Sequence, residues 1–393
     1  MTFTTRTIRK SRGGVKLAAA ASVLALVLAA CGGAADDDGD TDAAETEAET
    51  EEEPEAEEEP DDDGEPDTDT DTGEEISVEM RIADGYPSVN PIVVGGADYF
   101  MERIVEEGAA RGITVDIEYF GDQSLAGQAE LLDTVGTGVA DIGAVALSYF
   151  AEVVPAAGIA ELPGLYDSPA LGSPVFLQLI QEELMDDFID GANVRPILVA
   201  ALSPYNLFAV DNEILEPDDV AGLDIRSPGG VCDLAMEAVG ANPIQMPVAD
   251  QYIGLERGTL DGVVGPLANH RAYQIEEGTN YATNGLAMCG VSNMYMVNED
   301  WFQSQPPEVQ ELILDIGLEA SRNVGEFLET AEGEAIDYYR DYGMTVNDIE
   351  DRSAWDAALA DVQDDWIALM DDQGIDGQAL IDRWEELIAQ EQG

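Results

Sequence analysis

The chain has 393 residues, with 83 acidic and 16 basic side chains and one histidine, so its formal charge is −67. A chain this negative offers no basic surface to a polyanion, which excludes nucleic acid as a partner. With one histidine and no lysine after Lys16, the sequence also supports no conventional zinc cluster, serine triad or Walker-type phosphate loop. We therefore expect no catalytic residues, metal or cofactor.

Residues 1–30 have the pattern of an export signal. Five basic residues, the last of them Lys16, precede an apolar run from residue 17 to 30 that is too short to cross a bilayer. The run ends in Leu-Ala-Ala-Cys-Gly, which is similar to a bacterial lipobox, where cleavage precedes the cysteine and its thiol is acylated. We expect Cys31 to carry a lipid that holds the protein on the outer face of the cytoplasmic membrane. An ordinary buried cysteine or a soluble secreted form is the alternative.

Residues 31–75 are predicted to form a disordered acidic tether after the lipidated cysteine. Residues 32–75 contain 24 acids and no lysine or arginine. The remaining residues, 76–393, carry 59 acids against 11 arginines, a formal charge of about −48. Such an excess suggests a halophilic acidic protein that stays soluble at high salt, where repulsion between carboxylates is screened.

The folded part begins with alternating strands and helices. Residues 75–83 alternate apolar and polar side chains as a strand does, a helix is predicted at 101–111, and a strand at 113–119. A further helix at 125–135 and an apolar strand at 141–147 repeat the pattern. The sequence therefore predicts an α/β lobe.

The second half of the chain indicates a crossing to another lobe. A third strand at 194–202 runs through Ser203-Pro204-Tyr205-Asn206 into a short strand at 207–210, and we place the first hinge there. A long amphipathic helix is predicted at 308–328, with two prolines at its start. Helices at 355–369 and 379–388 close the sequence.

Two features of the middle segment concern chemistry. Arg226 is a cation in the mostly apolar segment 220–230, at the end of a predicted strand, and its guanidinium could hold a carboxylate through two parallel hydrogen bonds. A structural ion pair is the alternative. Cys232 and Cys289 form an even pair in an oxidising compartment, so a disulfide and two free thiols both remain open.

The run from Pro217 to Pro266 resembles the DctP-type solute receptors of tripartite ATP-independent periplasmic (TRAP) transporters. The resemblance lies in three ordered elements, at 218–228, 239–246 and 252–262, with weaker matches at 123–141 and 298–301. It implies an α/β fold of two lobes with a cleft between them, joined by crossing strands and a long lobe-spanning helix. The first lobe would contain residues 76–204 plus about 291–325, and the second 205–290 plus about 326–393.

The resemblance also implies a site. An arginine at the position of Arg226 grips the ligand carboxylate, and further positions line the pocket: Asn90, Gln123, Ser148, Asn206, Val248 and Gly265. Capping, turn or core roles are the alternatives for several of these residues.

The function implied is that of a receptor and not of an enzyme. It would capture a small organic acid by lobe closure and deliver it to TRAP membrane subunits for uptake driven by an ion gradient. The alternative is a substrate-binding lipoprotein of an ATP-driven importer. The sequence leaves open which acid is bound, the coupling ion and the oligomeric state.

Overall fold

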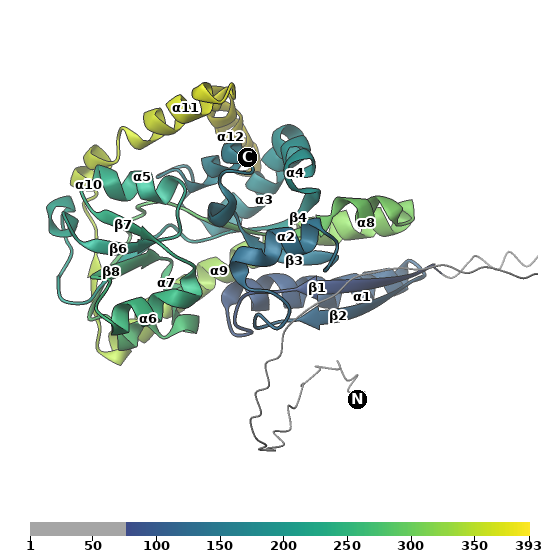
Figure 1. Cartoon of the computed structure of the whole chain (residues 1–393), viewed down its shortest axis with the longest axis horizontal. Coiled ribbons are helices and arrows are strands. Elements are labelled where there is room, and N and C mark those ends of the chain that lie inside the picture. Colours follow the sequence, from purple (N-terminus) through teal and green to yellow (C-terminus); the bar gives the residue numbers. More distant parts are fainter. Residues whose placement is uncertain (1–75) are drawn as a thin grey trace, which may run out of the picture. The chain divides into compact units, whose positions relative to one another are not determined.

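The computed structural model describes residues 76–393. The predicted export signal (1–30), the lipidation at Cys31 and the acidic tether (31–75) lie outside these residues. The described residues form two mixed β-sheets, each packed against helices (Figure 1), which confirms the predicted two-lobe α/β fold. None of the helices in this part of the chain is long and apolar enough to cross a bilayer.

The first sheet has the strand order β2-β1-β3-β10-β4. β1 pairs in parallel with β2 and β3, whereas β10 is antiparallel to both β3 and β4. In β1 the alternating sequence determines the two faces, since Val78, Met80 and Ile82 are buried while Ser77 and Glu79 are exposed. The strands are β1 (Ile76–Ala83), β2 (Ile113–Phe120), β3 (Ile142–Ala146), β4 (Val194–Ala201) and β10 (Ser292–Asn298).

The second sheet has the order β11-β9-β5-β8-β6-β7. β6 pairs in parallel with β7 and β8, and β5 is antiparallel to its neighbours β8 and β9. The strands are β5 (Asn206–Ala209), β6 (Asp224–Ser227), β7 (Asn242–Gln245), β8 (Gly262–Gly265), β9 (Tyr281–Asn284) and β11 (Thr345–Asp348). We call each sheet with the helices packed on it the first and the second lobe.

Helices cover both sheets. In the first lobe they are α1 (Asp98–Ala110), α2 (Leu131–Gly136), α3 (Pro169–Leu179), α4 (Met185–Ala192) and α8 (Glu299–Ser304). In the second lobe they are α5 (Val231–Ala238), α6 (Gln251–Glu256) and α7 (Leu267–His270). The C-terminal helices are α10 (Ser353–Ala358), α11 (Val362–Asp372) and α12 (Gly377–Glu391).

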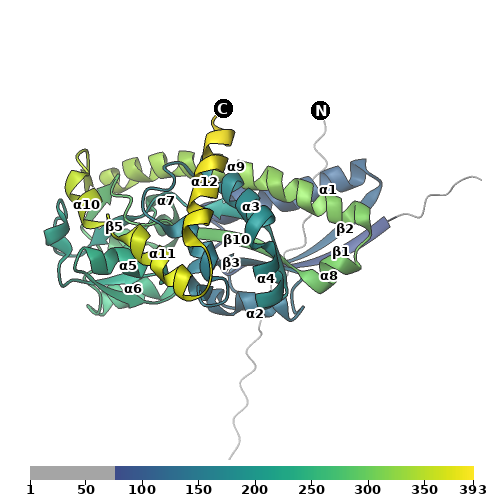
Figure 2. The same cartoon turned by 90° about the horizontal axis from the view of Figure 1, so that it is seen from above.

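Two extended connectors and one long helix join the lobes. The connector from β4 to β5 lies beside the connector from β9 to β10, because Leu202 N–H donates to Val291 O (3.0 Å) and Tyr205 N–H donates to Cys289 O (2.8 Å). The helix α9 (Pro307–Tyr342) runs past both sheets (Figure 2) and contacts β4 of the first and β11 of the second. Of the residues 203–206 predicted as a hinge, 203–205 lie on the first of these connectors and Asn206 begins β5.

Several predicted elements differ from the structure. The α-helix predicted at 125–135 begins only at Leu131, and a 3-10 turn at Gln128–Glu130 precedes it. The long helix predicted at 308–328 extends to Tyr342 and ends at Gly343 in the left-handed region. The helix predicted at 355–369 is divided into α10 and α11.

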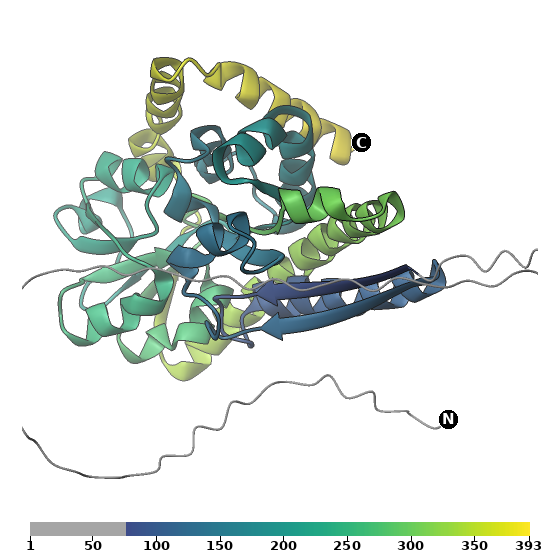
Figure 3. The same ribbon diagram turned by 45° about the vertical axis from the view of Figure 1, so that its right-hand side comes forward.

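The C-terminal helices pack on both lobes. Residues from about 326 to 393 were expected in the second lobe; α11 packs on α5 of that lobe, whereas α12 packs on α3 of the first (Figures 2 and 3). α12 packs on α3 because its apolar face inserts Trp384 against Phe176, with ring centroids 5.6 Å apart. The indole N–H of Trp384 also donates to Leu165 O at 3.0 Å.

Candidate ligand-binding site

One cavity lies where loops that follow two parallel strands of each sheet meet. Tyr86 and Asn90 follow β1, Ser148 follows β3, Arg226 lies near the end of β6, and His270 follows β8. The cavity holds about 380 Å³ of space, counting its opening to solvent. In open α/β sheets, ligands bind outside the carboxyl ends of the strands, which is the position of this cavity.

Arg226 is the cation of the cavity. It is 2% exposed, its Nε donates to Met246 O at 3.0 Å, and its Nη2 donates to the hydroxyl of Tyr149 at 3.3 Å. It takes part in none of the ion pairs found among residues 76–393, which involve other arginines. Since a buried charge is costly without a partner, an anion bound in the cavity would offset this cost.

Tyr149 links the two lobes at this guanidinium. It lies in the turn after β3 of the first lobe, and its hydroxyl accepts one hydrogen bond from Arg226 and a second from the N–H of Val248 at 2.9 Å. Both donors belong to the second lobe. The hydroxyl therefore holds the guanidinium in place and holds the lobes together with the same contacts.

Near the cavity, two further side-chain hydrogen bonds cross between the lobes. The amide Nδ2 of Asn269 donates to Oδ1 of Asn90 at 3.0 Å, and Nε2 of Gln128 donates to the hydroxyl of Tyr273 at 3.2 Å. Asn90 and Gln128 belong to the first lobe, and their partners belong to the second. With 1% to 5% of Asn90, Gln128 and Asn269 exposed, the described lobes are in a closed arrangement.

The orientation of the two asparagine amides follows from their partners. Asn90 Oδ1 accepts from the N–H of Ile92 at 3.0 Å as well as from Asn269 Nδ2, so the Asn90 oxygen must face both donors. This leaves Asn90 Nδ2 as a buried donor and Asn269 Oδ1 as a buried acceptor, neither with a partner in the described part of the chain. The hydroxyl of Ser148 is in the same situation. Buried polar groups of this kind are normally paired, so these three atoms are available to a bound water or solute.

His270 is a neutral hydrogen-bond acceptor in the cavity wall. Burial, with the positive charge of Arg226, lowers the pKa of the imidazole to about 3. Its Nδ1 lies 3.1 Å from Pro266 O, and because a carbonyl only accepts, Nδ1 carries the proton. The buried Nε2 is then a bare acceptor without a partner among residues 76–393.

Four of the seven predicted site residues line this cavity: Asn90, Ser148, Arg226 and Val248. The other three do not. Asn206 is buried, and its Oδ1 accepts from the N–H of Leu286, just after β9, at 3.1 Å. Gln123 is exposed in the turn after β2. Gly265 is covered by the ring of His270, since a Cβ there would lie 1.7 Å from the imidazole Cε1.

Several residues that line the cavity were not predicted from the sequence: Tyr86, Tyr149, Tyr205, Asn269, His270, Tyr273 and Asn293. One signal was available for some of them. Tyr86 and Tyr149 follow strands of the first sheet and His270 follows β8, so each is close to the carboxyl end of a strand.

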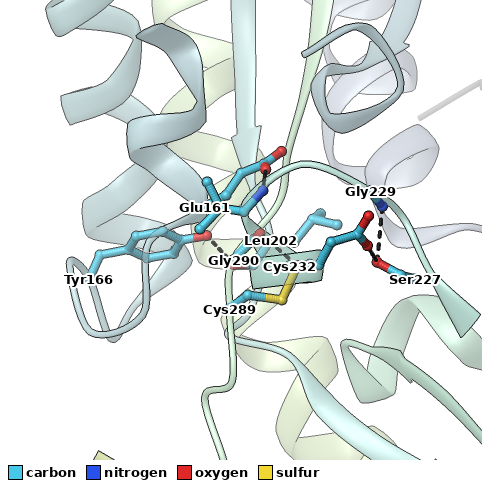
Figure 4. Close-up of a disulfide and its surroundings, with 10 residues drawn as sticks. Glu161, Tyr166, Leu202, Ser227, Gly229, Cys232, Cys289 and Gly290 are labelled. Carbon is cyan, nitrogen blue, oxygen red and sulfur yellow. Dashed lines mark hydrogen bonds between the residues drawn. A yellow bond between two sulfur atoms is a disulfide. The ribbon is translucent and has the colours of Figure 1, made fainter. Parts of the chain in front are cut away.

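Cys232 and Cys289 form a disulfide (Figure 4). It ties the first turn of α5 to the connector that leads into β10. Glu161 of the first lobe lies beside it, where its Oε2 accepts from the N–H of Val231 at 3.0 Å and its backbone oxygen accepts from the N–H of Gly290 at 2.9 Å. The disulfide therefore lies in the structure that joins the lobes, and its cysteines are not among the residues that line the cavity.

Comparisons with known proteins agree on one family. The family model for bacterial extracellular solute-binding protein, family 7 (DctP), matches residues 86–368. The 2,3-diketo-L-gulonate-binding periplasmic protein YiaO of Escherichia coli K12 is 23% identical over 276 residues, which are 68% of this chain and 81% of that protein. A protein of Sinorhizobium fredii is 26% identical over 208 residues, 51% of this chain and only 37% of that longer protein.

A solved structure shares the fold. The TRAP solute-binding protein of Rhodoferax ferrireducens T118, crystallised in complex with copurified benzoate, superposes with a TM-score of 0.74 at 21% identity. The match covers 80% of this chain and 98% of the other.

Among residues 76–393, no group of three or more histidine, cysteine, aspartate or glutamate side chains is arranged to hold a metal ion.

Proposed function

Because the chain belongs to family 7 of the bacterial extracellular solute-binding proteins, we propose that it is the receptor of a TRAP transporter for a small carboxylate. The ligand is captured by closure of the two lobes and delivered to the membrane subunits, which move it with an ion gradient. The family consists of binding receptors and not of enzymes. The family match does not favour the alternative of an ATP-driven importer.

The unpaired guanidinium of Arg226 carries this proposal. It is buried at the cavity with no acidic partner among residues 76–393. A ligand carboxylate would pair with its charge through charge-assisted hydrogen bonds. Two relatives whose names state a ligand bind carboxylates, namely 2,3-diketo-L-gulonate and benzoate. Because these two ligands differ in size, the arginine alone does not determine which carboxylate is bound, and the other residues of the cavity must select it.

Closure couples binding to delivery. In the closed arrangement the hydroxyl of Tyr149 contacts Arg226, and a ligand bound to the same guanidinium favours that arrangement over an open one. The two connectors and α9 are the segments about which the lobes would move. The membrane subunits would recognise the closed, loaded form.

The protein would act at the membrane surface through its lipid. Acylation of Cys31, followed by the acidic tether, would hold the receptor near its transporter while it captures solute. Incorporation of a labelled fatty acid by the wild-type chain, and its absence in Cys31→Ser, is the expected result. Equal labelling of both would contradict the anchor without affecting the proposal for the binding site.

A thermal-shift screen of organic acids at high salt tests the receptor function. A ligand at a hundred times its Kd adds ~2.7 kcal/mol to stability. Arg226→Ala should lose the shift, while Arg257→Ala should keep it, because Arg257 is exposed and lies outside the cavity. An acid that raises the melting temperature of Arg226→Ala as much as that of the wild type would show that its carboxylate does not bind at Arg226.

A further inference from the structure

We propose that the ligand is a hydroxy monocarboxylate, whose carboxylate binds Arg226 and whose hydroxyl donates a hydrogen bond to Nε2 of His270. The inference rests on the proposed receptor function and specifies its substrate class. It comes from the acceptors that the cavity presents in addition to its single cation.

The first acceptor is the imidazole of His270. Its ring is 2% exposed, stacks on Phe208 with centroids 5.2 Å apart, and is held by the hydrogen bond from Nδ1 to Pro266 O. These contacts fix both the orientation of the ring and its tautomer, so a ring flip cannot place an N–H donor at the position of Nε2. A buried acceptor of this kind is costly to leave unpaired, so a ligand hydroxyl that donates to it would be favoured.

The glycine at position 265 makes room for this ring. Any Cβ at Gly265 would lie 1.7 Å from Cε1 and 2.5 Å from Nε2 of His270. The imidazole therefore occupies the space that a side chain from the end of β8 would fill. Gly265 and His270 form a pair, in which the glycine allows the acceptor to stand in the cavity wall.

A second acceptor strengthens the requirement. Asn269 Oδ1 has no partner in the described part of the chain, because its amide nitrogen is committed to Asn90. A second carboxylate placed against these two atoms would bring only acceptors to them and leave Nε2 of His270 and Oδ1 of Asn269 unpaired. The cavity has only one cation, Arg226, so a second carboxylate would also be buried without a counter-charge.

An ammonium group is also disfavoured as the donor. None of the described residues that line the cavity is acidic, so a buried ammonium would have no counter-charge and would lie near the positive charge of Arg226. A neutral hydroxyl satisfies the acceptors without this cost. Apolar side chains in the wall, including Ile92, Leu202 and Val291, suit the carbon skeleton of such an acid.

Calorimetric titration with matched acids tests the inference. The probes are lactate and propionate, mandelate and phenylacetate, and 3-hydroxybenzoate and benzoate, each pair differing by one hydroxyl, with succinate and alanine as a dicarboxylate and an amino acid. For the skeleton that fits, the wild-type mature chain should bind the hydroxy acid roughly 10- to 100-fold more tightly than its deoxy partner, because a buried acceptor is otherwise left unpaired.

His270→Phe keeps an aromatic ring against Phe208 but removes both nitrogens. In this variant the preference for the hydroxy acid should fall to about 1, while the deoxy acid still binds at Arg226. The wild-type comparison needs no variant and decides the matter even if His270→Phe fails to fold. Equal binding within every pair that binds, or tighter binding of succinate or alanine, would overturn the hydroxy-acid inference alone. Binding of no acid in the panel would overturn the receptor for carboxylates as well.

Discussion

Glu161 offers a test of how the junction between the lobes responds to pH. Its side chain is 1% exposed, and burial, with a smaller contribution from the charge of Asp233, raises its pKa to about 8. The N–H of Val231 donates to Oε2, but Oε1 has no partner in residues 76–393. The carboxyl is therefore expected to be protonated in the folded protein at neutral pH.

The sign of the effect on stability follows from this proton. The folded state keeps it up to about pH 8, whereas the unfolded chain releases it near the ordinary pKa of 4.5. The stabilising contribution is complete below about pH 4.5 and is lost as the pH rises through about 8. Since a tenfold change in proton affinity equals ~1.4 kcal/mol, the loss has an upper limit on the order of 5 kcal/mol. The glutamine in Glu161→Gln cannot ionise, so this variant should not lose stability in this way as the pH rises.

Urea denaturation at pH 5, 7 and 9, at one high salt concentration and with the disulfide intact, measures this difference. Glu161→Gln should match the wild type within ~1 kcal/mol at pH 5 and exceed it by a few kcal/mol at pH 9. Asp84 and Glu332, whose pKa values burial raises to about 6 and about 7, titrate in both proteins and so cancel in the comparison. A difference that does not change with pH would refute the assignment of this pKa.

Three further predictions concern closure, the cavity wall and the disulfide. Tyr149→Phe removes the hydroxyl of the first lobe that accepts hydrogen bonds from the cavity guanidinium and from the N–H of Val248, both of the second lobe. It should weaken ligand binding by ~1–3 kcal/mol in calorimetry and expand the ligand-bound protein in X-ray scattering, and unchanged affinity would contradict the proposed link. Gly265→Ala should displace the ring of His270 and abolish discrimination between hydroxy and deoxy acids, whereas retained discrimination would show that the ring does not set it. Reduction of Cys232–Cys289, which are 57 residues apart, should cost ~4 kcal/mol in urea denaturation, and a loss below ~1 kcal/mol would show that the bond does not constrain the unfolded chain.

Local patterns predicted much of the fold. β1 and β2 were found within a residue or two, because alternation along a strand that is buried on one face is visible in the sequence. The start of α9 was found because two prolines precede an apolar stripe, but its last turns were missed. The placement of α12 depends on Trp384 meeting Phe176 about two hundred residues earlier in the chain, and no local pattern contains that contact.

The site was predictable where one residue was unusual on its own. Arg226 stands out as a cation in an apolar segment, and the structure places it buried at the cavity. His270 was noticed only as the single histidine of a chain without catalytic parts. Its role as an acceptor depends on the Pro266 carbonyl, on the space above Gly265 and on stacking with Phe208, and these become visible only when the second sheet is assembled.

The dissociation constant of one tightly bound carboxylate, measured by calorimetry for the wild type, Arg226→Ala and Arg257→Ala, tests the central claim most directly. Hydrogen bonds to a charged group contribute ~1.5–3 kcal/mol each, so losing the guanidinium should weaken binding by at least roughly 100-fold. Arg257→Ala should bind as the wild type does. An Arg226→Ala protein that is folded and binds the acid within a few-fold of the wild type would contradict the account.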